Sequence, residues 1–107
     1  MPTYGELSRK YAEKVSSAAK RTHLTKSARF ITESQKQDKL VAALQEIWRD
    51  LERYRISDED RDTILRMAGR ELGLEDPGTF VILVKEASNE NFVALANYWS
   101  TFFAELD

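Results

Sequence analysis

Apolar side chains recur every three or four residues through most of the sequence, a spacing that places them on one face of an α-helix. The first segment carries one such stripe, made of Tyr4, Leu7, Tyr11, Val15 and Ala18. A second stripe predicts a helix from about residue 34 to 54, and it consists of Leu40, Leu44, Ile47, Trp48, Leu51 and Tyr54. No glycine or proline lies between Gly5 and Gly69, which favours helices over hairpins.

The segment between these two helices is rich in hydroxyl and basic side chains, which suggests a break in the first helix. Thr25 is a candidate N-cap for a following turn or helix, with Leu24, Ala28 and Ile31 on its inner face. Nothing in the sequence ITESQKQDK forces a stop, so residues 24–54 could form one helix or two.

Ser57 is predicted to cap a further helix, because the acidic run 58–60 follows it and suits the positive end of a helix dipole. Gly73 is expected to end this helix, and Asp76–Pro77 to begin the next. The apolar face of the helix that Ser57 caps is expected to consist of Ile64, Leu65, Ala68 and Leu72.

The run TFVILVKEA, residues 79–87, is the one ambiguous segment, since its β-branched residues are also typical of a strand. No partner strand is evident, so we expect a short central helix that is apolar on all sides. Asn89 or Asn91 is predicted to cap one C-terminal helix. Its core residues are expected to be Phe92, Leu95, Ala96, Trp99, Phe102, Phe103 and Leu106. The predicted fold is all-α, a single domain over residues 1–107 that forms a compact bundle of five to six helices.

Composition agrees with a globular domain, since 42% of the 107 residues are hydrophobic and 32% are charged. There is no cysteine, which excludes disulfides and thiolate metal sites. No apolar run exceeds five residues, and the N-terminal sequence lacks the apolar core of a secretory signal. We therefore expect a cytoplasmic protein with no membrane partner.

Charge is unevenly distributed along the chain. Residues 1–39 contain nine Lys or Arg and four Asp or Glu, a formal charge of +5. Residues 40–107 contain seven and fourteen, a formal charge of −7. Such polarity is typical of a face for an anionic partner or of copies that stack head to tail, and it also arises by chance on solvated helices.

Patterns typical of enzymes are weak. Asp58, Asp60 and Asp62 have the spacing of a calcium loop, but Thr63 and Gly69 stand where glycine and glutamate are required. The only histidine, His23, has no nearby ligand partner in the sequence, and the glycines do not form a phosphate-binding loop. We expect a non-catalytic protein with no cofactor and no metal.

Four blocks occur in an order that resembles a known family: YAEKV (11–15), LTKSARF (24–30), MAGRELGLED (67–76) and KEASNENFVALANYWSTFFAEL (85–106). They resemble the small helical subunit of type III-A CRISPR (Csm) effector complexes. The matching positions are Leu24, Thr25 and Ser27, then Ala68, Gly69, Arg70 and Glu71, then Phe92, Tyr98 and Phe102. Lys26 stands where the family has a second hydroxyl, and the chain ends in FFAELD rather than a basic tail.

The resemblance implies a non-catalytic subunit whose copies stack along a ribonucleoprotein filament beside other effector subunits. Its basic face would run along the backbone of the guide RNA–target RNA duplex without reading bases. The candidate RNA-binding residues are Arg9, Lys10, Lys14, Lys20, Arg21, Lys26, Arg29 and Arg70.

Other interpretations remain open at this point. Arg70 could instead interact with the last carbonyls of its own helix, and the N-terminal cations could form a solvated face. The chain as a whole could be a helical adaptor that docks protein partners and has no nucleic-acid role. A helix-turn-helix regulator is disfavoured, because the junction GLEDPG (73–78) leads into an apolar helix that cannot face a DNA groove.

Overall fold

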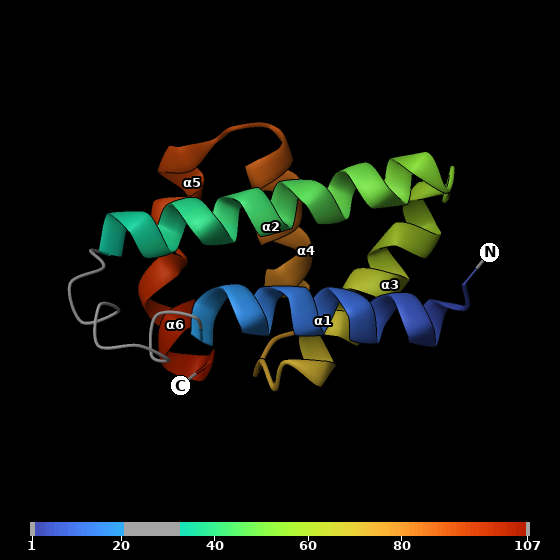
Figure 1. The fold of residues 1–107 in the computed structure, drawn as a ribbon, viewed down its shortest axis with the longest axis horizontal. Helices are drawn as coiled ribbons and strands as arrows, with labels where there is room; N and C mark the ends of the chain where they lie inside the picture. Colours follow the sequence, from blue (N-terminus) through green and yellow to red (C-terminus); the bar gives the residue numbers. More distant parts are fainter. Residues whose placement is uncertain (1, 21–32, 107) are drawn as a thin grey trace.

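The computed structural model describes residues 2–20 and 33–106, and every element in these ranges is a helix (Figure 1). The helices are α1 (Tyr4–Lys20), α2 (Glu33–Arg53), α3 (Asp58–Glu71), α4 (Gly78–Ser88), α5 (Phe92–Ala96) and α6 (Trp99–Leu106). The prediction of an all-α bundle is confirmed. The radius of gyration is 13.4 Å, close to the value of about 13 Å typical of a compact chain of this length.

Two antiparallel helices, α1 and α2, lie side by side at the front of the molecule, and α3 and α4 cross behind them (Figure 1). Helix α1 contacts α2 and α3, while α4 contacts α2 and α3, so these four helices close a ring around the core. Helix α5 packs against α4, and α6 packs against α5 and α1. The face that α1 and α2 share therefore looks away from the rest of the bundle.

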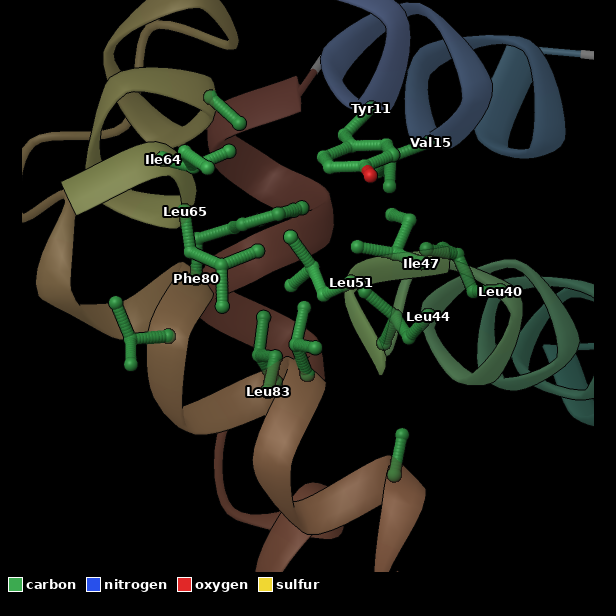
Figure 2. Close-up of a cluster of buried hydrophobic side chains, with 14 of the residues drawn as sticks. Tyr11, Val15, Leu40, Leu44, Ile47, Leu51, Ile64, Leu65, Phe80 and Leu83 are labelled. Atoms are coloured by element: carbon green, nitrogen blue, oxygen red, sulfur yellow. The ribbon is translucent and has the colours of Figure 1, made fainter. Parts of the chain in front are cut away.

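The core is formed by the apolar stripes that the sequence predicts. Figure 2 shows buried side chains from four helices pointing toward one another. The labelled ones are Tyr11, Val15, Leu40, Leu44, Ile47, Leu51, Ile64, Leu65, Phe80 and Leu83. Trp48 is only half-buried, and the guanidinium of Arg61 covers its ring at 4.8 Å from the centroid.

The helix ends follow local chemistry closely. The Ser57 hydroxyl accepts a hydrogen bond from the Asp60 amide at 3.3 Å, which confirms the predicted cap of α3. After α3, Gly73 adopts the left-handed backbone that ends many helices, with φ of 80°. Helix α4 begins at Gly78, one residue later than predicted, and Asp76 Oδ1 accepts a hydrogen bond from the Gly78 amide.

Helix α4 confirms the helical interpretation of the ambiguous apolar run. Its buried side chains are Phe80, Val81, Leu83, Val84 and Ala87. One expectation needs correction, because Ile82 is exposed and the helix is therefore not buried on all sides.

The prediction of one continuous C-terminal helix is wrong. A turn at Asn97–Tyr98 divides it into α5 and α6, and Asn91 caps the first part. The break interrupts the single helical periodicity predicted for residues 92–106, and Phe92 is exposed at 54% instead of lying in the core. Ala96 is exposed as well, whereas Leu95, Trp99 and Phe102 are buried as predicted.

The crossing of α3 and α4 depends on Gly69, and this generates a first prediction. A Cβ at this position would lie 2.9 Å from the Pro77 carbonyl oxygen and 3.3 Å from Phe80 Cβ. We expect Gly69→Ala to lower the free energy of unfolding by about 1–3 kcal/mol, because backbone must shift to admit the methyl group. Urea unfolding followed by circular dichroism measures this change.

Gly5→Ala is the matched control, because no atom lies within 4 Å of a Cβ built there. It should raise the free energy of unfolding by up to about 1 kcal/mol through helix propensity. Equal effects of the two substitutions would contradict the close-contact explanation.

Candidate nucleic-acid interface

A groove of about 380 Å³ runs between the polar faces of α1 and α2. Lys10 and Lys14 lie one turn apart on α1, while Arg49 and Arg53 lie one turn apart on α2. The groove is lined by Lys10, Tyr11, Lys14, Glu46, Ile47, Arg49, Asp50 and Arg53. Helical spacing on two antiparallel helices thus brings four cations to one surface.

This groove continues along the two helices toward the start of α2. A neighbouring hollow shares Lys14 and Glu46 with it and adds Lys39. Together the two hollows are lined by five cationic and two acidic side chains, a formal charge of +3. We call this continuous surface the basic groove. From Lys39 to Arg53 it follows α2 for about 21 Å, at about 1.5 Å per residue.

The carboxylate of Asp50 is the central acceptor of the basic groove. The Tyr11 hydroxyl donates to Asp50 Oδ2 at 2.6 Å, and Lys10 Nζ lies 3.3 Å from the same oxygen. Arg53 Nη2 pairs with the other oxygen, Oδ1. One nearly buried carboxylate therefore joins two residues of α1 to the C-terminal turn of α2.

The ionisation of this cluster is shifted toward the charged carboxylate and the neutral phenol. Burial alone would raise the pKa of Asp50, but the hydrogen bonds from Tyr11 and Lys10 and the charges of Lys10 and Arg53 outweigh it and lower that pKa. Burial and the hydrogen bond to Asp50 raise the pKa of Tyr11 far above its usual value. Asp50 thus stays a carboxylate at neutral pH.

The second carboxylate, Glu46, is more exposed and pairs with Lys14. The hydrogen bond and charge of Lys14 lower the pKa of Glu46. Arg49 adds positive charge beside Glu46 and makes no hydrogen bond or ion pair with the residues that the structure describes. Exposed pairs of this kind contribute little to stability, so these cations remain available to another anion.

The structure brings together only part of the predicted RNA-binding set. Lys10 and Lys14 line the basic groove. Arg9 is exposed elsewhere on α1, where its Nε donates to the Gly5 carbonyl at 3.3 Å. Arg70 is exposed in the last turn of α3, where a cation also suits the helix dipole.

The remaining predicted residues lie at or beyond the end of α1. Lys20 is its last residue, so the helix axis carries it toward the far end of the basic groove. Arg21, Lys26 and Arg29 lie outside the described residues, as do Thr25 and the choice between one helix and two over residues 24–54.

Sequence reasoning missed three cations of the basic groove, namely Lys39, Arg49 and Arg53. Arg49 and Arg53 lie in residues 40–107, whose net charge is negative, and Lys39 lies at the boundary of that segment. A count of net charge therefore does not reveal these three cations. Their signal is the spacing 39, 46, 49, 50 and 53, which places charged residues on the face of α2 opposite its apolar stripe.

Comparisons add no relative of known function, since no known protein family, curated protein or solved structure matches this chain. In residues 2–20 and 33–106, no cluster of three acidic or histidine side chains is placed to hold a metal ion. Within the same ranges, every helix is too short or too polar to span a bilayer.

The Asp50 cluster predicts a specific pH dependence of stability. Because the folded pKa of Asp50 lies below its reference value of 3.8, its contribution is present above about pH 4 and is lost as the pH falls through the folded pKa. We expect Asp50→Asn to lower the free energy of unfolding by about 1–3 kcal/mol at pH 7, with a smaller difference at pH 3. Urea unfolding of both proteins at the two pH values tests this.

Glu46→Gln serves as the control, because it neutralises an exposed carboxylate on the same face of α2. Its cost at pH 7 should be at most about 0.5 kcal/mol. A difference between wild type and Asp50→Asn that does not change with pH would contradict the proposed role of the carboxylate.

Proposed function

We propose that the protein is a non-catalytic small subunit of a type III CRISPR RNA-guided effector complex, which binds the backbone of the guide RNA–target RNA duplex. The observation that carries this proposal is the basic groove, in which α1 and α2 jointly present a formal charge of +3. A continuous cationic surface is what sequence-independent phosphate binding requires.

The ion pairs within the groove are compatible with phosphate binding. The side chains of Lys10 and Arg53 remain 55% and 70% exposed while they contact Asp50. A phosphate oxygen can therefore approach either cation from the solvent side without breaking the hydrogen bond between Tyr11 and Asp50. The carboxylate holds both cations near the groove floor, which reduces the ordering that binding must impose.

The groove chemistry favours backbone contacts over base recognition or catalysis. Tyr11 is its only aromatic residue, and its hydroxyl is engaged by Asp50, while Trp99 and Phe102 are buried in the core. No stacking platform for bases is therefore offered by these rings. The lowered pKa of Asp50 also makes its carboxylate a weak general base at neutral pH.

The opposite charge gathers on α3 and the turn that follows it. Residues 58–76 contain seven acidic and three basic side chains, a formal charge of −4. A subunit with a cationic groove on one pair of helices and an acidic third helix can attract a second copy in a fixed order. Several copies on one RNA would raise the overall affinity through effective concentration.

RNA binding is tested by fluorescence anisotropy with labelled single-stranded and duplex RNA from about 50 to 300 mM salt. We expect binding that ignores sequence and weakens steeply with salt. The double variant Lys14→Gln with Arg49→Gln should bind about tenfold more weakly at the lowest salt, with a salt dependence reduced by roughly 1.5 in log–log slope.

The control is the double variant Arg66→Gln with Lys85→Gln, which removes the same charge from exposed positions on α3 and α4 outside the groove. It should change affinity only slightly. Equal losses in the two double variants would show that net charge, and not the basic groove, governs binding. No binding by the wild type at about 50 mM salt would overturn the proposal.

One observation favours a protein contact, which the proposed subunit would use between copies and a protein–protein adaptor, the second candidate function, would use for its partner. Phe92 and Val93 are exposed at 54% and 81% at the start of α5. Phe92 lines a hollow between α2 and α5 together with Val41, Ala42, Ala96 and Trp99, and Val93 follows it in the chain. Adjacent apolar side chains at this exposure are typical of a protein contact, and we propose that a second copy of the chain covers them.

Cooperative binding to a long RNA tests this contact between copies. We expect the wild type to bind a long RNA cooperatively, and Phe92→Ser with Val93→Ser to lose cooperativity while keeping its affinity for a short RNA. Ile82→Ser, on the exposed side of α4, is the control. Unchanged cooperativity in the double variant would overturn the contact. If the wild type binds no RNA, the adaptor function becomes the better account of the apolar pair.

A further inference from the structure

Three helices of the bundle end in the same backbone motif, but with different residues at its left-handed position. After α3 this position is Gly73, whose amide donates to the Arg70 carbonyl, while the Leu74 amide donates to Gly69. After α2 and α4 it is Arg55 and Glu90, with φ of 55° and 57°. Glycine adopts this conformation without steric strain, whereas any other residue loses stability in it.

The turn after α2 requires the left-handed backbone conformation of Arg55, but it does not require an arginine side chain there. The Arg55 amide donates to the Glu52 carbonyl at 2.9 Å, and the Ile56 amide donates to the Leu51 carbonyl at 3.2 Å. This pair of backbone hydrogen bonds reverses the chain so that Ile56 returns to the core, where it is buried. Glycine would make the same two bonds, because they involve only the backbone.

The Arg55 guanidinium is not used by the fold. The residue is exposed, and its side chain makes no hydrogen bond, ion pair or ring contact with the residues that the structure describes. A cation after the last turn of a helix interacts favourably with the helix dipole, but this effect is small at an exposed position. The arginine therefore carries a backbone cost that no internal contact offsets.

Arg55 lies close in the chain to the end of the basic groove. It lies two residues beyond Arg53, which lines the basic groove at the C-terminal end of α2. Two residues of chain span at most about 7 Å, so the backbone of Arg55 lies close to that of Arg53, at the end of the cationic row.

We propose that Arg55 is a further phosphate-binding residue, which extends the basic groove beyond α2 and contacts the RNA backbone there. This inference rests on the proposed RNA-binding function. It adds a residue that the groove lining does not include and that the sequence pattern did not single out. A planar guanidinium with no internal partner presents its full set of donors to a phosphate.

The variant Arg55→Gly separates RNA binding from stability, because RNA affinity should fall while the melting temperature does not. We expect the melting temperature to stay equal or rise by up to about 4 °C, since glycine relieves the left-handed strain. RNA affinity at about 50 mM salt should fall about three- to tenfold, with the salt dependence reduced by roughly 0.7–0.9 in log–log slope. Arg55→Lys should recover most of the affinity without the gain in melting temperature.

Glu90→Gly is the matched control, because it replaces the other strained residue at the same position of the same motif. It should raise the melting temperature while leaving RNA affinity unchanged or slightly tighter.

Three other outcomes would contradict the Arg55 assignment, and they differ in what they imply for the proposed RNA-binding function. If the wild type binds RNA and Arg55→Gly binds equally well, the Arg55 proposal is wrong and the proposed function stands. If Arg55→Gly loses both stability and affinity, and Arg55→Lys restores both, Arg55 has a structural role instead. If the wild type does not bind RNA, the proposed function fails, and the assignment of Arg55 fails with it.

Discussion

The carboxylate of Asp50 fixes the register between the polar faces of α1 and α2, and the basic groove depends on that register. Apolar contacts such as those of Tyr11, Val15, Leu44 and Ile47 hold the two helices together, but they do not fix the polar faces in register. The short bond from the Tyr11 hydroxyl to Asp50 does so, because its donor and acceptor come from different helices and are buried. Removing one partner of such a bond leaves a buried polar group without its contact, which is costly.

The same carboxylate explains why like charges can gather in the groove. Lys10 and Arg53 would repel each other if Asp50 did not lie between them, and Glu46 plays a similar part beside Lys14 and Arg49. Because two acids face five cations, the neutralisation is incomplete. The two carboxylates thus reduce repulsion among the cations, yet the groove retains a charge surplus that an added anion can reduce.

Most of the fold could be predicted from the sequence because its decisive signals are local. The cap at Ser57, the end of α3 at Gly73 and the apolar stripes each depend on residues within a few positions. The break at Asn97–Tyr98 could not be predicted in this way, because no glycine or proline marks it. For the groove, the α1 cations could be named in advance, whereas Arg49 and Arg53 join them only through the pairing of α1 with α2, which is a tertiary contact.

The size of the charge surplus limits how tightly the basic groove can bind a phosphate backbone. A formal charge of +3 along about 21 Å neutralises only a few phosphates, and the salt dependence of binding scales with that number. Under the proposed function, one copy should therefore hold RNA weakly, and a copy that neither reads bases nor binds tightly would gain specificity only from its neighbours. For that proposal, the exposed Phe92 and Val93 and the acidic α3 are as relevant as the groove itself, because contacts between copies would convert several weak sites into one strong surface.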